Sequence, residues 1–204
     1  MLRMTKSALS GGLALILAVA AAAPAFASGS VTGTVYGKKA TETYSDIKAN
    51  TPAAQAIGLV TEAGLITGEP DGTFSPDKPA TNSVFAEAIV KYLGLGSSVP
   101  AGSGGQGYVN EAESLGLLPS GTSTTGSMNR LDVALAFAKA LKLTPVTGTL
   151  PWSDASSIPT ADQGLLLALY QKGYFKGFSN NTFGGSATLT REQIALIFGR
   201  LLGL

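Results

Sequence analysis

The chain has 204 residues, with 14 lysines and arginines against 13 aspartates and glutamates, and its formal net charge at pH 7 is +1. A charge so near zero provides no basic field, so we expect no nucleic-acid partner. The absence of histidine and cysteine excludes disulfides, zinc sites with nitrogen or sulfur ligands, and Ser-His-Asp or Cys-His nucleophiles. The carboxylates show no pair at a defined separation, so we expect no enzyme, no cofactor and no metal site.

The first 27 residues have the pattern of a signal peptide. Arg3 and Lys6 precede the apolar run Leu9–Ala23, and Ala25–Ala27 matches a small-x-small cleavage site. The run is short for a membrane span, and no second apolar stretch of about 18 residues follows. We therefore expect a secreted chain with no transmembrane segment after cleavage; an uncleaved anchor is the alternative.

Residues 28–43 are predicted to be a short N-terminal linker. Val31 and Val35 alternate with small polar residues. The segment is therefore either a disordered tail or a β-strand that adds to a partner protein of the envelope.

Residues 44–95 predict two helices joined by a turn. An aromatic-Ser-Asp start at Tyr44–Asp46 precedes an Ala-rich apolar helix. Gly68 and the strong turn signal Asp71-Gly72 follow that helix. Residues 80–95 then predict the second helix.

Residues 96–143 repeat this plan in a weaker form. Gly96–Gly107 is small and Gly-rich, and it is predicted to be a flexible connector. Tyr108–Ser127 keeps a short helix but has neither the aromatic-Ser-Asp start nor the Asp-Gly turn. Met128–Leu143 predicts a full helix.

Residues 144–151 form a connector rich in Thr and Pro, and residues 152–204 return to the first pattern. Trp152 opens the aromatic-Ser-Asp start, Gly177 follows the first helix, and Asn180-Asn181 is a weaker turn signal. The chain closes on a predicted helix.

The second helices of the three units align without a gap. Their N-caps are predicted at Thr81, Asn129 and Thr190, and Gln193 completes a capping box with Thr190. Apolar residues at i, i+4 and i+8 form one stripe on each helix. The stripes are Phe85-Ile89-Leu93, Val133-Phe137-Leu141 and Ile194-Phe198-Leu202.

Arg130 and Arg191 occupy the first position of two of these helices. The helix dipole gives a cation no stabilisation there. Such an arginine either receives an anion at the helix start or bridges to a carboxylate of a neighbouring repeat. The spacing alone leaves both interpretations open.

Together these motifs resemble the S-layer homology (SLH) repeat. The resemblance covers residues 44–204 and implies an all-α fold, in which three tandem helix–loop–helix repeats form a pseudo-threefold helical spindle. The first and second repeats are degenerate. The implied order is signal peptide 1–27, linker 28–43, repeat 44–95, connector 96–107, repeat 108–143, connector 144–151 and repeat 152–204.

The resemblance also implies a function, namely non-covalent anchoring in the cell wall or S-layer of a Gram-positive bacterium. The partner would be a secondary cell wall polymer, a peptidoglycan-linked glycan whose pyruvylated sugars supply carboxylates. The alternative is a structural protein whose repeats scaffold another envelope protein.

The candidate polymer-binding residues lie at motif positions in the inter-repeat grooves. Asn82 replaces the motif arginine in the first repeat and brings no charge. Asp46 and Asp154 also suit a turn or cap, and Trp152 also suits the core. The full set is Arg130, Arg191, Asn82, Gly68, Asp71, Gly72, Gly177, Asn180, Asp46, Asp154 and Trp152.

Overall fold

The computed structural model describes residues 31–204, and this part of the chain is helical and contains no strand. The predicted signal peptide lies outside the described residues. Two short 3-10 turns cover Gly96–Ser98 and Ala155–Ser157. The α-helices are α1 (Val31–Thr43), α2 (Pro52–Glu62), α3 (Asn82–Tyr92), α4 (Gly104–Ser114), α5 (Arg130–Ala140), α6 (Thr160–Gln171) and α7 (Arg191–Leu201). The all-α prediction is confirmed.

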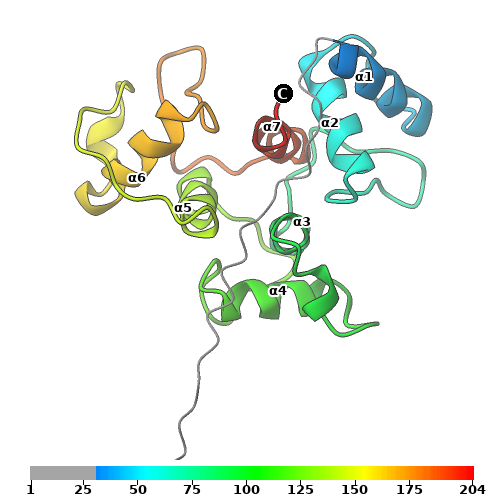
Figure 1. The fold of residues 1–204 in the computed structure, drawn as a ribbon, viewed down its shortest axis with the longest axis horizontal. Coiled ribbons are helices and arrows are strands. Elements are labelled where there is room, and N and C mark those ends of the chain that lie inside the picture. The colour runs from blue at the N-terminus through cyan, green and yellow to red at the C-terminus, as the bar shows by residue number, and fades with distance from the viewer. Residues whose placement is uncertain (1–30) are drawn as a thin grey trace, which may run out of the picture.

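Three helices, α3, α5 and α7, are seen end-on at the centre of the molecule, and the other helices lie outside them (Figure 1). Helix α4 packs on α3, α6 packs on α5, and α2 packs on α7. Each of these three outer helices therefore packs on the central helix of a different repeat. The contact between α2 and α7 brings the first repeat against the last.

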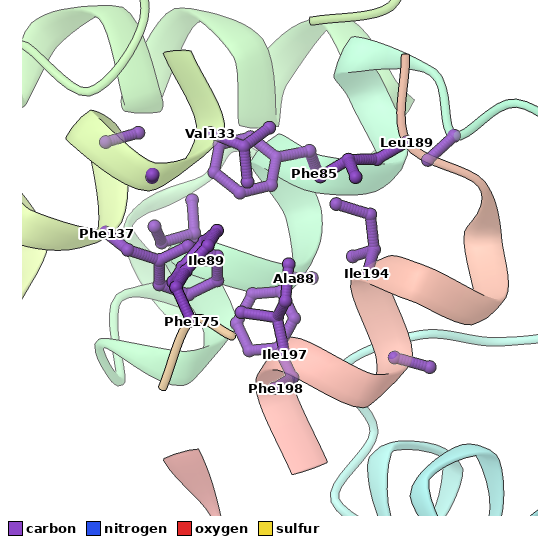
Figure 2. Close-up of a cluster of buried hydrophobic side chains, with 14 of the residues drawn as sticks. Phe85, Ala88, Ile89, Val133, Phe137, Phe175, Leu189, Ile194, Ile197 and Phe198 are labelled. Carbon is purple, nitrogen blue, oxygen red and sulfur yellow. The ribbon is translucent and has the colours of Figure 1, made fainter. Parts of the chain in front are cut away.

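The predicted apolar stripes meet between the central helices and form the core (Figure 2). The rings of Phe137 and Phe198 lie 4.9 Å apart between centroids, and those of Phe85 and Phe137 lie 5.6 Å apart. Phe175, from the loop after α6, packs its ring 5.8 Å from Phe137. Aromatic pairs at this spacing in edge-on geometry stabilise a core beyond the effect of their buried area.

The central helices begin where the sequence predicts. Thr81 Oγ1 accepts a hydrogen bond from the Val84 N–H, and Asn129 Oδ1 accepts one from the Asp132 N–H. Thr190 forms both bonds of the predicted capping box with Gln193. These caps satisfy N–H groups that have no partner inside the helix.

Two segments, one N-terminal and one between the first and second repeats, differ from the prediction. Residues 31–43 form a helix, α1, and not a disordered linker or strand, because α1 packs on α2, buries Ala40 and pairs Lys39 with Glu62. The Gly-rich connector is also shorter than predicted, since α4 begins at Gly104. Burial of Val109 and Ala112 in the core offsets the helix-breaking tendency of its glycines.

Candidate functional site: the groove at Arg191

The start of each central helix is bound to the backbone of another repeat. The first two N–H groups of α3, α5 and α7 donate to carbonyls at distances between 2.6 and 3.1 Å. Backbone carbonyls therefore occupy the helix starts, where a bound anion was one of the two interpretations of the motif arginines. The pairs are Asn82 to Gly126, Ser83 to Thr124, Arg130 to Ala187, Leu131 to Gly185, Arg191 to Lys78 and Glu192 to Pro76.

The side chain of Arg191 extends this attachment. Its Nε donates to the carbonyl of Phe74 at 2.7 Å, and its Nη2 donates to the carbonyl of Thr67 at 2.6 Å. The guanidinium carbon lies 4.8 Å from the centroid of the Phe74 ring. Arg191 thus connects the third repeat to the loop after α2 of the first repeat, through carbonyls and not through the carboxylate that was the other expectation.

The other two motif positions make the equivalent connection. Asn82 Nδ2 donates to the carbonyl of Ser123 at 2.8 Å, and Arg130 Nη2 donates to the carbonyl of Lys176. The first repeat is thereby held to the second, and the second to the third. Together with Arg191, these side chains link the three repeats in a ring.

All three side chains are largely buried, with exposed fractions of 7% for Asn82, 5% for Arg130 and 4% for Arg191. Burial lowers the pKa of Arg130 to about 10, and the nearby charge of Arg200 contributes. Burial also lowers the pKa of Arg191, but the Glu69 carboxylate opposes this shift. Guanidinium groups nevertheless stay protonated in proteins, so both side chains carry a positive charge.

Arg191 faces a cavity of about 300 Å³ between the first and third repeats. Within the described chain, Nη1 of Arg191 makes no hydrogen bond. This nitrogen is also not completely buried. Lys78 and Glu69 form an exposed ion pair of 3.1 Å in the wall of this cavity. The lining residues are Leu65, Ile66, Thr67, Gly68, Glu69, Lys78, Pro79, Thr81, Val84, Glu87 and Arg191.

A smaller cavity of about 180 Å³ occupies the corresponding place in the second repeat. Its wall carries the carboxylate of Asp132, where the first repeat has Val84, and Leu135, where the first repeat has Glu87. Asn82 does not line this cavity, and its Oδ1 is buried without a hydrogen-bond partner in the described chain. The charged residues in the lining of the second groove are Asp132 and Lys139, and this lining contains no arginine.

Asp46 and Asp154 hold loops of their own repeats. The Asp46 carboxylate accepts hydrogen bonds from the N–H groups of Phe74 and Ser75 at 2.9 and 2.8 Å. The Asp154 carboxylate accepts from Phe183 and Gly184 at 2.7 and 2.9 Å. Burial raises the pKa of Asp154, but these backbone hydrogen bonds outweigh it and the net pKa lies below its ordinary value.

The remaining candidates also shape the loops. Asp71 Oδ1 accepts bonds from the N–H and the hydroxyl of Thr73, and Asn180 Oδ1 accepts the equivalent pair from Thr182. Gly72 has a φ of +82° at the tip of the first turn. Both predicted turns are confirmed, and neither Asp71 nor Gly72 lines the large cavity.

Gly68 and Gly177 allow close approach of the aromatic residue that opens their repeat. A Cβ on Gly68 would overlap the Tyr44 ring and lie 2.6 Å from the Thr73 carbonyl oxygen. A Cβ on Gly177 would lie 2.5 Å from Trp152 Cδ1. Trp152 is only 5% exposed and packs 4.7 Å from the Phe183 ring, so it is a core residue.

Of the predicted set, the structure brings only Gly68 and Arg191 together in the large cavity. The predicted set missed the other nine lining residues, among them Lys78, Glu69 and Val84. Nothing in their local spacing indicates a site, because they become neighbours of Arg191 only when the first and third repeats pack together.

Residues 31–204 contain no group of three or more acidic side chains arranged to hold a metal ion. In the same range, no helix has both the length and the apolar character needed to cross a bilayer.

Comparison with known proteins identifies the class of these repeats. Residues 43–81 and 153–195 match the S-layer homology domain. These segments contain the Tyr44–Asp46 start, the Ser153-Asp154 part of the second start, both turns, the N-cap Thr81 of α3 and the start of α7. The chain therefore contains S-layer homology repeats in these two regions, as its motifs predicted.

Two relatives from Acetivibrio thermocellus share parts of the sequence. The chain is 30% identical to a cellulosome-anchoring protein over 162 residues, which are 79% of this chain and 26% of that protein. It is 41% identical to cell surface glycoprotein 1 over 58 residues, which are 28% of this chain and 2% of that protein. The chain thus spans about a quarter of the first relative and a small part of the second.

Proposed function

We propose that this chain anchors non-covalently to the bacterial cell wall by binding an anionic wall polymer in the groove at Arg191. The ligand would be a secondary cell wall polymer, and a pyruvylated sugar would supply its carboxylate. Export to the wall of a Gram-positive bacterium is part of this proposal. The similarity to a cellulosome-anchoring protein and to a cell surface glycoprotein supports it.

The observation that carries the proposal is a guanidinium held at an open cavity between two repeats. Two of its nitrogens are fixed on the carbonyls of Phe74 and Thr67, so the group is already ordered before any ligand binds. Its Nη1 remains free to donate to a carboxylate, and a charge-assisted hydrogen bond is stronger than a neutral one. Preorganised donors lose little conformational entropy on binding.

The rest of the lining suits a sugar. Thr67, Thr81 and Glu87 line the cavity with hydroxyl and carboxylate groups, which can bond the hydroxyls of a glycan. Leu65, Ile66 and Val84 line it with apolar surface. A mixed wall of this kind around a few directed polar groups is typical of small-molecule sites.

Replacing Arg191 is a poor test, because the substitution would also disconnect the third repeat from the first. We instead choose Val84→Asp, which copies into the first groove the residue that the second repeat has at the equivalent position. Asp132→Val, the reverse change in the second groove, is the matched control. Both positions are the third residue of an 11-residue central helix.

The assay is retention of residues 28–204 by purified wall sacculi, before and after chemical removal of ketal pyruvate. We expect Val84→Asp to weaken binding about tenfold, or about 1.4 kcal/mol, through repulsion of the ligand carboxylate. Asp132→Val should bind as the wild type does. Full retention after pyruvate removal would contradict the proposed ligand. A stable protein partner that persists without wall binding would favour the scaffold alternative.

A further inference from the structure

The first and third repeats build the same guanidinium contacts on different loops. Arg191 donates to the carbonyl of Thr67, and Arg130 donates to the carbonyl of Lys176, the aligned residue. Each guanidinium lies over the phenylalanine that ends the loop motif, at 4.8 Å from Phe74 and 5.1 Å from Phe183. The groove at the loop of the third repeat, here called the third groove, therefore contains a guanidinium with the same contacts as Arg191 in the first groove.

The two loops differ at the residue after the close-packed glycine. In the first repeat this residue is Glu69, which pairs with Lys78 at 3.1 Å. In the third repeat it is Phe178, whose ring centroid lies 4.8 Å from the Arg130 guanidinium carbon. Phe175 and Phe183 lie at 5.5 and 5.1 Å from the same carbon, so aromatic rings surround the group.

This enclosure changes what Arg130 can reach. Its Nε is buried and has no hydrogen-bond partner in the described chain, whereas the equivalent Nε of Arg191 donates to Phe74. Arg130 lines neither of the two cavities described above. A buried cation with an unpaired donor is costly, and the low pKa of Arg130 has the same cause.

A second difference accompanies the first. Gly184 has a φ of +68°, and a Cβ on it would overlap the Phe178 ring, with Phe178 Cδ2 only 3.0 Å away. The aligned residue of the first repeat is Ser75, which has a similar φ of +55°. A serine at this place is therefore possible only without the phenylalanine. The pairs Glu69 with Ser75 and Phe178 with Gly184 form two alternative loop designs.

We propose that Phe178 is a plug that closes the third inter-repeat groove, so that the chain has one anion-binding groove, at Arg191. The second groove offers an anion no equivalent of Arg191, since its motif position is Asn82, which carries no charge, and the charged residues of its wall are Asp132 and Lys139. The statement that the one anion-binding groove is the groove at Arg191 rests on the proposed function. The closure by Phe178 is a separate claim, and the experiment below tests it separately.

Exchanging the two loop designs tests the plug in both directions. The double variant Phe178→Glu, Gly184→Ser gives the third repeat the residues of the first. The reciprocal variant Glu69→Phe, Ser75→Gly gives the first repeat the residues of the third. Each combination already exists in one repeat of this fold, so each exchange is matched to a loop that accommodates it.

The measurement is isothermal titration of residues 28–204 with a pyruvate-ketal methyl glycoside as probe, read as the number of sites per chain. We expect one site in the wild type, two in Phe178→Glu, Gly184→Ser, and none in Glu69→Phe, Ser75→Gly. Two sites in the wild type, or no gain in the first variant, would overturn the plug. No site in the wild type but one in that variant would refute the proposed function at Arg191 and leave the plug standing. No site in either refutes both.

A second measurement needs no variant to fold. The side-chain Nε–H signals of Arg130 and Arg191 can be followed by NMR in the wild-type chain while the same glycoside is added. A shift confined to Arg191 supports one open groove. A shift at Arg130 overturns the plug, and no shift at either arginine overturns the single site at Arg191.

Discussion

Gly68→Ala should destabilise the fold through packing alone. The added Cβ would overlap the Tyr44 ring and lie 2.6 Å from the Thr73 carbonyl oxygen, closer than real Cβ contacts. Neither neighbour can move cheaply. Tyr44 is 6% exposed and its hydroxyl accepts the Gly68 N–H at 3.0 Å, while the Thr73 carbonyl accepts the Glu69 N–H at 2.7 Å.

Overpacking of a rigid site costs about 1–3 kcal/mol, and the lost N–H bond adds about 1 kcal/mol. At roughly 2–4 °C per kcal/mol for a chain of this size, the melting temperature should fall by about 5–15 °C. Thermal unfolding followed by circular dichroism measures this shift. Gly96→Ala is the control, since its nearest neighbour atom lies at 3.4 Å. A Gly68→Ala chain that melts with the wild type would refute the role of Gly68 in packing.

Four further predictions follow from the same contacts. Thr190→Ala removes the capping box of α7 and should cost about 0.5–2 kcal/mol in urea unfolding, with Gln193 left in place. Asp154→Ala leaves two loop N–H groups without their acceptor and should cost about 2–3 kcal/mol in the same assay. The wild type should have a larger free energy of unfolding than Asp154→Asn, and this difference should be full above about pH 4, the ordinary aspartate pKa. The difference should shrink as the pH falls through the lower pKa of the folded state. A difference that does not depend on pH would contradict this. A chain of residues 28–143 lacks α7, on which α2 packs, and should show no cooperative melt at the full-length temperature.

The sequence predicts features that depend on neighbours within one repeat. The Thr190–Gln193 capping box, the Asp71 turn and the stripe around Phe137 all appear as predicted. Each depends on residues only a few positions apart, so helix geometry and turn chemistry decide it. The plain interpretation of Asp46 and Asp154 as turn carboxylates succeeds for a related reason, since the aspartate and its loop belong to one unit.

The features that sequence alone did not reveal depend on contacts between repeats. Arg191 bonds to Phe74 and Thr67, which are 117 and 124 residues away in the chain. No local pattern indicates that a backbone carbonyl will stand where an anion was expected. The helix α1 was missed for a similar reason, because its stability comes from packing on α2 and not from its own weak helical pattern.

One signal in the sequence could have shown which grooves are open. The aligned loops read Thr-Gly-Glu-Pro-Asp-Gly-Thr-Phe and Lys-Gly-Phe-Ser-Asn-Asn-Thr-Phe. The exchange of Glu69 for Phe178 replaces a solvated carboxylate with a large apolar ring next to a motif arginine. Its meaning appears only when the structure shows that the ring covers Arg130.

The donor geometry of an arginine at this motif position suits two roles, namely contact with the neighbouring repeat and the proposed binding of a ligand. A guanidinium has five N–H donors in a planar fork, and Arg191 uses Nε and Nη2 on carbonyls of the first repeat while its Nη1 makes no hydrogen bond within the described chain. In the proposed complex, one rigid group would therefore hold both the ligand and the neighbouring repeat. A lysine, with a single ammonium, could not hold both in fixed directions. Arg191 completes the groove only when the first and third repeats are joined, so binding of the proposed polymer would stabilise the closed ring of repeats by mass action. The proposed function therefore predicts that anchoring strength and the stability of the fold are linked at Arg191.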